Sequence, residues 1–358
     1  MTKKRDERPS LDSVIEELVA ETGPSYTALA VSVSSPHTET ERFAGTLAID
    51  DRTAVDARAL FDIASLSKTM VAVLAARLVA AQRLDLDEPV RRYLPVGSGS
   101  GADRITMRHL LTHTAGFPSD VFLWRHPLIP APERLSHVLS TALQTPPGQE
   151  FRYSCTGFIA AGAVLERIAG APLDGLLREQ VWSALGMDDT GYGPVAPENA
   201  VVTERQDYIG RGLVRGEVHD ELSWYLGSRT GNAGVFSTLG DMRAFAASFV
   251  DDSAFGAEVH RLTTTDQRPA GACTPYRHAL GIRIGDATFM GDADVIGHTG
   301  FTGTMWFADP AGGSAGVMLT NRVHPSRELV DIGPLRRRFV EAAASSRSRP
   351  PRPSGGAP

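Results

Sequence analysis

Residues 61–82 have the sequence FDIASLSKTMVAVLAARLVAAQ. From Ser67 to Gln82 the apolar residues lie on nearly every face of a helical projection, a pattern typical of a helix that is buried on all sides. Ser65 and Lys68 stand three residues apart at the start of this helix, which places both side chains on one face, one turn apart. The stretch therefore predicts a buried helix whose first turn carries a hydroxyl group beside an amine.

Lys68 is unusual in the composition of the chain. The only other lysines are Lys3 and Lys4, and every remaining basic residue is an arginine. Coding preference alone is one explanation of this bias, and a Ser-x-x-Lys motif alone occurs in many unrelated helices. Arginine stays protonated in proteins, however, whereas desolvation lowers the pKa of a lysine so that it can act as a base. Lys68 is therefore a candidate base for Ser65.

Segments with the alternation and β-branched content of strands lie on both sides of this helix in the sequence. Amphipathic helices are predicted at residues 10–19 and 335–344, and the middle of the chain favours helices, among them 158–168. This order predicts an α+β domain interrupted by a helical insertion, with a cleft between the two lobes. The predicted strands are residues 27–34, 40–50, 234–237, 279–284, 304–309 and 316–320.

The domain organisation follows from this pattern. We predict that residues 1–95 and 200–344 form one αβ sandwich and that residues 96–199 form a helical lobe inserted into it. Residues 345–358 are rich in Ser, Arg, Pro and Gly, and this composition predicts a disordered tail.

The overall composition narrows the class of protein. Of the 358 residues, 42% are hydrophobic, which excludes wholesale disorder, and the net charge of −6 argues against binding nucleic acid through an overall positive field. Cys155 and Cys273 are the two cysteines, so a disulfide framework is not expected and a cysteine-rich metal site is excluded. Because neither a secretory signal nor a membrane-spanning run is recognisable, we expect a soluble cytoplasmic protein that does not bind membranes.

Two further motifs supply groups for serine chemistry. Tyr153 lies in the segment FRYSCTGF, residues 151–158, before a predicted helix, and its hydroxyl group can relay a proton; taken alone it is also typical of a core tyrosine. Residues 297–304, GHTGFTGT, lead into a strand; taken alone they also suit a glycine-rich hairpin entry. A backbone N–H of this second segment and the N–H of Ser65 would form an oxyanion hole.

Three motifs of this chain, taken in order, resemble those of the penicillin-recognising serine hydrolases. They are Ser65-x-x-Lys68, Tyr153-Ser-x and His298-Thr-Gly. That superfamily includes class C β-lactamases, D-alanyl-D-alanine peptidases and family VIII esterases. The resemblance spans residues 60–325 and implies a β-lactamase-like αβα sandwich, in which helices flank an antiparallel sheet, together with an all-helical lobe. Further runs that resemble the same superfamily lie at residues 105–118, 185–191, 216–220, 234–238 and 319–325.

The resemblance implies a role for each motif. Ser65 would be the nucleophile, and Lys68 and Tyr153 would be the base and the proton relay, with the choice of resting base left open because the two groups titrate as a pair. His298, Thr299 and Gly300 would form the substrate-binding strand motif. Phe301 would supply the second N–H group of the oxyanion hole.

Two positions depart from the motifs of the β-lactamases and peptidases. Cys155 stands where these enzymes usually have an asparagine that binds the substrate amide, and a thiol cannot make that contact. His298 replaces the commoner lysine, and a neutral imidazole holds a substrate carboxylate less firmly. Both departures favour ester chemistry over the cleavage of lactams and peptides, while Cys155 is also typical of a small packing residue.

Three functions follow from these observations. The favoured hypothesis is a serine hydrolase that cleaves a small ester or amide through an acyl-enzyme on Ser65. An acyltransferase or D-amino-acid peptidase of a biosynthetic pathway is the alternative within the superfamily, and a catalytically silent binding protein is the alternative outside enzymes. The expected partner is a small-molecule ester, amide or peptide, with no cofactor and no metal ion, and the oligomeric state stays open.

Overall fold

A computed structural model of the chain describes residues 9–36, 38–119, 121–122, 125, 129–328 and 330–344. The predicted disordered tail, residues 345–358, lies outside the described residues. Within the described part, no helix is both long enough and apolar enough to cross a lipid bilayer.

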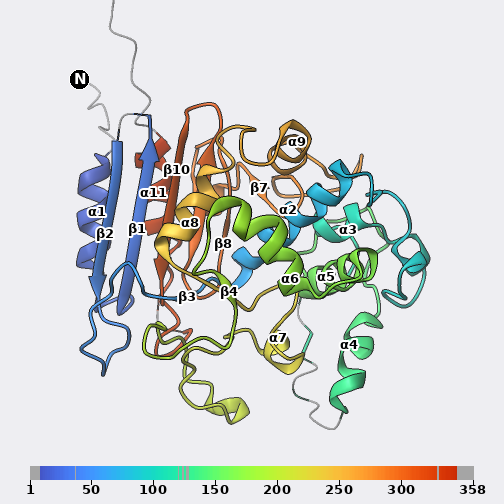
Figure 1. The fold of residues 1–358 in the computed structure, drawn as a ribbon, viewed down its shortest axis with the longest axis horizontal. Coiled ribbons are helices and arrows are strands. Elements are labelled where there is room, and N and C mark those ends of the chain that lie inside the picture. Colours follow the sequence, from blue (N-terminus) through green and yellow to red (C-terminus); the bar gives the residue numbers. More distant parts are fainter. Residues whose placement is uncertain are drawn as a thin grey trace, which may run out of the picture.

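The described residues form two antiparallel sheets (Figure 1). The larger has seven strands in the order β2-β1-β10-β9-β8-β7-β6, and the smaller has three in the order β3-β5-β4. The strands of the large sheet are β1 Ala28–Ser35, β2 Thr38–Gly45, β6 Arg277–His278, β7 Arg283–Ile284, β8 Ile296–Thr299, β9 Met305–Asp309 and β10 Ser314–Thr320. Those of the small sheet are β3 Phe61–Asp62, β4 Gly191–Tyr192 and β5 Val235–Ser237.

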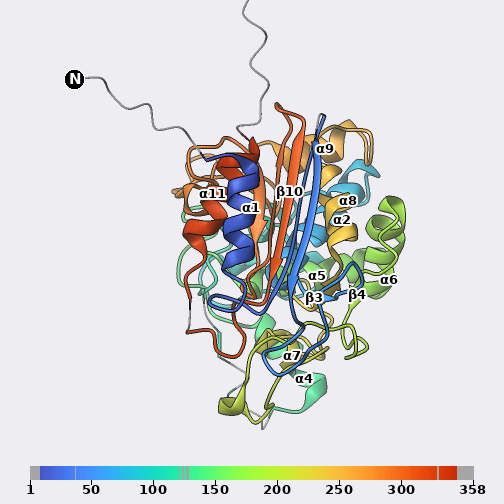
Figure 2. The ribbon, with the colours of Figure 1, turned by 90° about the vertical axis from the view of Figure 1, so that its left-hand side faces the viewer.

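Helices cover both faces of the large sheet (Figure 2). The helices α1 and α11 lie on one face, while α2 and α8 lie on the other, and each face has its own cluster of buried apolar side chains. The predicted α+β architecture, an antiparallel sheet flanked by helices, is therefore confirmed. The α-helices are α1 Leu11–Ala20, α2 Ser67–Ala80, α3 Met107–Leu111, α4 Ala131–Leu139, α5 Cys155–Ala169, α6 Leu173–Leu177, α7 Glu221–Tyr225, α8 Leu239–Ala247, α9 Ala257–Thr264, α10 Ala287–Met290 and α11 Gly333–Ala344.

The helix α2 is the centre of the larger core. Every residue from Ser67 to Ala76 is buried, in agreement with the absence of a polar face in the sequence. It lies against α5, α6 and α9, and its first turn approaches β8 through the short helix η1, Ala64–Leu66. This helix therefore carries its N-terminal residues into the region where the sheet meets the helical segments.

One predicted strand is wrong. Residues 279–284 were expected to form a single strand, but β6 and β7 form a hairpin in which His278 pairs with Arg283. The chain turns at Gly281, whose φ of +64° suits glycine, and a Cβ there would lie 3.2 Å from the carbonyl oxygen of Lys68. Close packing against α2 therefore imposes the turn, and the alternation of residues in this segment does not reveal it.

The region predicted as a helical lobe, residues 96–199, contributes the helices α3 to α6. It also contributes β4, which pairs with β5 in the small sheet. The division of the chain into a sandwich and an inserted lobe stays a prediction.

Candidate active site

The turn that carries Ser65 connects the small sheet to α2. The strand β3 ends at Asp62, η1 follows, and α2 begins directly after it at Ser67. Ser65 is partly buried and lines a cavity of about 480 Å³. Its position combines access to a small molecule with a backbone that is fixed by a strand on one side and a helix on the other.

The amine of Lys68 lies within hydrogen-bond distance of the Ser65 hydroxyl group. The distance from Nζ to Oγ is 3.0 Å, and the same amine donates to the carbonyl oxygen of Asn232 at 2.8 Å. The side chain of Lys68 is completely buried, and no carboxylate forms an ion pair with it in the described part of the chain. The predicted contact between hydroxyl group and amine is thus present.

Opposed effects set the pKa of Lys68. Burial lowers this pKa, whereas ionised Cys155 and Tyr153, together with Asp220, raise it, and with those charges present the balance lies above the ordinary value. Burial also raises the pKa of the Cys155 thiol, so that this group is neutral near pH 7. Near pH 7 the neutral thiol places no negative charge beside Lys68. Fewer charges then oppose the effect of burial, which lowers the pKa of this amine.

Cys155 is the first residue of α5, which begins three residues before the predicted start at 158. Its Sγ lies 3.7 Å from Nζ of Lys68. Asn232, which accepts a hydrogen bond from the same amine through its backbone, uses its side-chain oxygen for the hydroxyl groups of Ser223 and Thr230. The thiol therefore contacts the base directly, and the neighbouring amide oxygen of Asn232 is engaged within the protein.

Tyr153 lies two residues before α5 and lines the same cavity as Ser65. Its ring centroid is 5.1 Å from Nζ of Lys68 and 5.4 Å from the guanidinium carbon of Arg283. On the other side the ring lies 4.4 Å from the ring of His113. The phenol is thus placed between a buried amine, a guanidinium group and an imidazole.

The strand β8 brings the third motif to the cavity. Thr299, Gly300 and Phe301 line it, whereas His298 is completely buried beneath them. Gly300 approaches the turn of the nucleophile so closely that a Cβ would lie 2.7 Å from the carbonyl oxygen of Ile63. The motif predicted from the sequence therefore lies next to the Ser65 turn, with Phe301 exposed at its edge.

His298 is neutral in this position. Burial lowers its pKa well below the ordinary value, and the positive charges of Arg283 and Lys68 act in the same direction. Its Nδ1 lies 2.8 Å from the carbonyl oxygen of Thr299, which places the proton on Nδ1. Nε2 of His298 is buried without a hydrogen-bond partner among the described residues.

Two more buried imidazoles lie near the site, His113 against Tyr153 and His278 against His113, and sequence reasoning did not assign them to it. His113 accepts a hydrogen bond from the N–H of Ser154 at Nδ1, and His278 is 5.4 Å from it, ring to ring. Burial lowers the pKa of His278 to about 4 and that of His113 well below the ordinary value. The only signal for His113 was its position in a run that resembles the superfamily, and His278 gave none.

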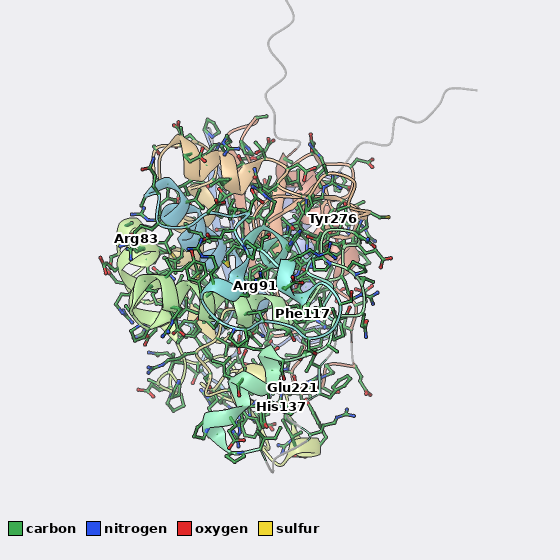
Figure 3. All side chains as sticks on the ribbon, turned by 90° about the vertical axis from the view of Figure 1, so that its right-hand side faces the viewer. Arg83, Arg91, Phe117, His137, Glu221 and Tyr276 are labelled. Atoms are coloured by element: carbon green, nitrogen blue, oxygen red, sulfur yellow. The ribbon has the colours of Figure 1, made fainter. Side chains whose placement is uncertain are left out.

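Arginines form much of the remaining cavity wall, and the sequence did not single them out because arginine is abundant throughout the chain. Arg327 is held by Glu204 and Glu221, and Arg283 by Asp286. The positions of Glu221 and Tyr276, which contact Arg327 and Arg283, are labelled in Figure 3. The full set on the wall is Arg283, Arg322, Arg327 and Arg336.

A family model described as Beta-lactamase matches residues 11–340. The chain belongs to the beta-lactamase family. The resemblance to the penicillin-recognising superfamily is therefore confirmed, and this beta-lactamase family member is a serine hydrolase.

Relatives of this beta-lactamase family member have different described activities. It is 26% identical over 325 residues to an Escherichia coli (strain K12) protein named "Putative D-alanyl-D-alanine carboxypeptidase", across 79% of this chain and 74% of the relative. The structure of EstCE1, "a hydrolase with promiscuous acyltransferase activity", superimposes with a TM-score of 0.74 at 20% identity, over 93% of this chain and 98% of the other. A Yersinia pestis beta-lactamase/D-alanine carboxypeptidase gives 0.73 at 17% identity, over 94% and 98%.

Proposed function

We propose that the protein hydrolyses a small ester through an acyl-enzyme on Ser65. The observation that carries this proposal is the 3.0 Å contact between Oγ of Ser65 and Nζ of the completely buried Lys68. An amine in this position takes the hydroxyl proton when it is neutral, and a serine without its proton is a strong nucleophile.

The proposed reaction has two halves. Oγ of Ser65 attacks the carbonyl carbon and its proton passes to Lys68, directly or through Tyr153, while the N–H groups of Ser65 and Phe301 stabilise the oxyanion. When the tetrahedral intermediate collapses, the carbon–oxygen bond of the ester breaks and the departing alkoxide receives that proton. Water then attacks the acyl-enzyme along the same path and releases the acid and free Ser65.

Ester cleavage is favoured over amide cleavage by Cys155. Its Sγ lies beside Nζ of Lys68, in the position where an amide-binding asparagine is usual in the peptidases. The neighbouring Asn232 does not supply this contact, because its side chain is engaged with Asp220, Ser223 and Thr230. Esters need less help with the leaving group than amides do, because an alkoxide leaves more readily than an amine anion.

Trapping of the acyl-enzyme tests this proposal. Wild type and Ser65→Ala are incubated with a fluorophosphonate and with a series of p-nitrophenyl acyl esters, and the intact mass of the protein is measured. We expect one added phosphonyl group per chain and ester turnover in the wild type, and neither in Ser65→Ala. Equal labelling and turnover in both proteins would show that Ser65 is not the nucleophile, and their absence in both would favour a binding protein.

The arginines of the cavity support a second candidate, a carboxypeptidase that recognises a carboxylate beside the scissile bond. Arg336 donates to the carbonyl oxygens of Gly300 and Thr304, at 2.9 and 3.0 Å, and the described residues offer it no ion pair. Burial, with repulsion from Arg322 and Arg283, lowers the pKa of Arg336 to about 9. A guanidinium group in this situation is stabilised by an anionic ligand.

Substitution of Arg336 separates the two substrate classes. For an ester with a carboxylate in its leaving group, Arg336→Gln is expected to lower kcat/KM roughly tenfold or more, because a charge-assisted hydrogen bond is lost. For the matched neutral ester the change is expected to stay within about twofold. Arg337→Gln is the control, since Arg337 lies on the same helix and donates to Thr288 outside the cavity. Equal losses on both esters would argue against a carboxylate subsite.

A further inference from the structure

Asp62 is a buried carboxylate one turn before the nucleophile. Only 2% of it is exposed, and it forms no ion pair in the described part of the chain. Both of its side-chain oxygens accept backbone N–H groups instead, Oδ1 from Ala64 at 2.8 Å and Oδ2 from His219 at 2.7 Å. Burying a carboxylate without an ion-pair partner is costly, and at Asp62 two backbone N–H groups compensate part of this cost.

The first of these segments is the turn of the nucleophile. Ala64 has a φ of +48°, in the left-handed region that a residue with a Cβ seldom adopts. The strain lies directly before Ser65, and the bond from the N–H of Ala64 to Asp62 holds the chain in that conformation. Strained backbone at such a position persists only where its surroundings fix it. The carboxylate therefore helps to hold the turn that directly precedes Ser65.

The second segment is the loop that carries Phe301. The backbone N–H of His219 donates to Asp62, and the ring of His219 lies 5.6 Å from the ring of Phe301. The hydroxyl group of Thr302 donates to the backbone oxygen of Asp62 at 2.8 Å, and that of Thr304 to the oxygen of Ile63 at 3.1 Å. Asp62 is thus hydrogen-bonded to two segments at the cavity, the turn that carries Ser65 and the loop of residues 300–304.

We propose that Asp62 is a positioning residue that holds the N–H groups of Ser65 and Phe301 at the separation required by an oxyanion. This inference rests on the proposed function, because it assigns Asp62 to the acyl-transfer step at Ser65. The side chain does not touch the substrate. It acts through the backbone of Ala64 and through His219, and its effect therefore falls on the tetrahedral intermediate and not on the bound ester.

Asp62→Asn tests the proposal, because an amide keeps the shape but can accept only one of the two N–H groups. We expect kcat for a p-nitrophenyl ester to fall about 100-fold, since a small displacement of oxyanion donors has effects of this size. KM is expected to stay within about threefold. The Ki of a boronic acid, whose adduct on serine places an oxygen in the oxyanion hole, is expected to rise in parallel with the loss in kcat.

The matched control is Asp241→Asn. Asp241 is another buried aspartate that accepts a backbone N–H, from Asp189, and a hydroxyl group, from Thr190, but it does not line the cavity. Its variant is expected to lose stability and to keep kcat and the boronic acid Ki. If Asp62→Asn behaves in the same way, Asp62 is a structural residue and the proposal is wrong.

Two further variants keep the test decisive if Asp62→Asn folds poorly. Ala64→Gly in the Asp62→Asn background allows the left-handed conformation without the carboxylate, and it is expected to restore kcat at least tenfold. Thr302→Val removes the hydroxyl bond to Asp62 on the other side and is expected to lower kcat about tenfold with the same rise in Ki. Absence of both effects would overturn the proposal. Failure of wild type to label or turn over would instead overturn the proposed function.

Discussion

Lys68→Arg is expected to reduce acylation of Ser65 at least about 1000-fold while the protein stays folded. The amine of Lys68 contacts Oγ of Ser65 at 3.0 Å and is completely buried, so it is placed to receive the hydroxyl proton. A guanidinium group keeps the positive charge but does not lose its proton in a protein. Arginine therefore preserves the electrostatic environment of Tyr153 and Cys155 and removes only the function of a base.

Burst kinetics with a p-nitrophenyl ester measure this loss, because the burst reports acylation separately from the later hydrolysis. The control is Arg77→Lys, the reverse exchange on the same helix, where the side chain lies near Oε1 of Gln180 and away from the cavity. This variant is expected to keep the wild-type burst. A Lys68→Arg protein with normal acylation would show that Tyr153 or another group is the base.

Acidification from pH 7 to pH 5 is expected to lower the free energy of unfolding, by about 2 kcal/mol through His278 alone. The source is the group of buried histidines around Tyr153. Burial lowers the pKa of His278 to about 4, and the pKa values of His113 and His298 lie well below the ordinary 6.5. Lys68 and Arg283 oppose protonation of His113 and His298 as well, and Asp266 and Asp286 compensate only at His278.

The sign follows from proton uptake. Between the folded and the unfolded pKa values, the unfolded chain binds more protons than the folded protein, so stability rises with pH in this window. For His278 the contribution is complete above about pH 6.5 and is lost as the pH falls toward 4, which amounts to about 2 kcal/mol at pH 5. His113 and His298 change the stability in the same direction. Such a loss is a large part of the stability of an ordinary domain.

Denaturant unfolding at several pH values tests this expectation. His278→Asn keeps a donor for the carbonyl oxygen of Ala279 but cannot take up a proton, so it is expected to remove about 2 kcal/mol of the change in unfolding free energy between pH 7 and pH 5. The control is His137→Asn, because His137 is exposed on α4 (Figure 3), and it is expected to leave the dependence unchanged. If the free energy of unfolding changes equally with pH in the wild type and both variants, the buried histidines are not the source of the pH dependence.

The sequence was sufficient to predict the parts of the site that depend on local spacing. The positions of Ser65 and Lys68 follow from one helical turn, and the buried character of α2 follows from its uninterrupted apolar composition. The approach of Tyr153 and of Thr299 and Gly300 to this helix required the resemblance, since nothing in their local patterns indicates which distant segment they face.

The remaining groups of the site depend on contacts between distant segments. Arg283 faces Tyr153 and His278 faces His113 only because the chain reverses at Gly281, where α2 leaves no room for a side chain. Asp62 gives no signal of its own, because its partners Ala64 and His219 are backbone groups, and any residue type supplies a backbone N–H. Single-residue propensities contain no information about such pairings.

The burial of α2 from its first turn has a consequence for the way in which the protein loses activity. The amide hydrogens of α2 are shielded by packing on all sides. They can therefore exchange with solvent only when the helices and the sheet packed against α2 move apart. Surface loops can fray and return without disturbing this helix. The amine of Lys68 at its first turn should therefore stay beside the hydroxyl group of Ser65 in η1 during local fluctuations, and the ability to form an acyl-enzyme should disappear only together with the cooperative core.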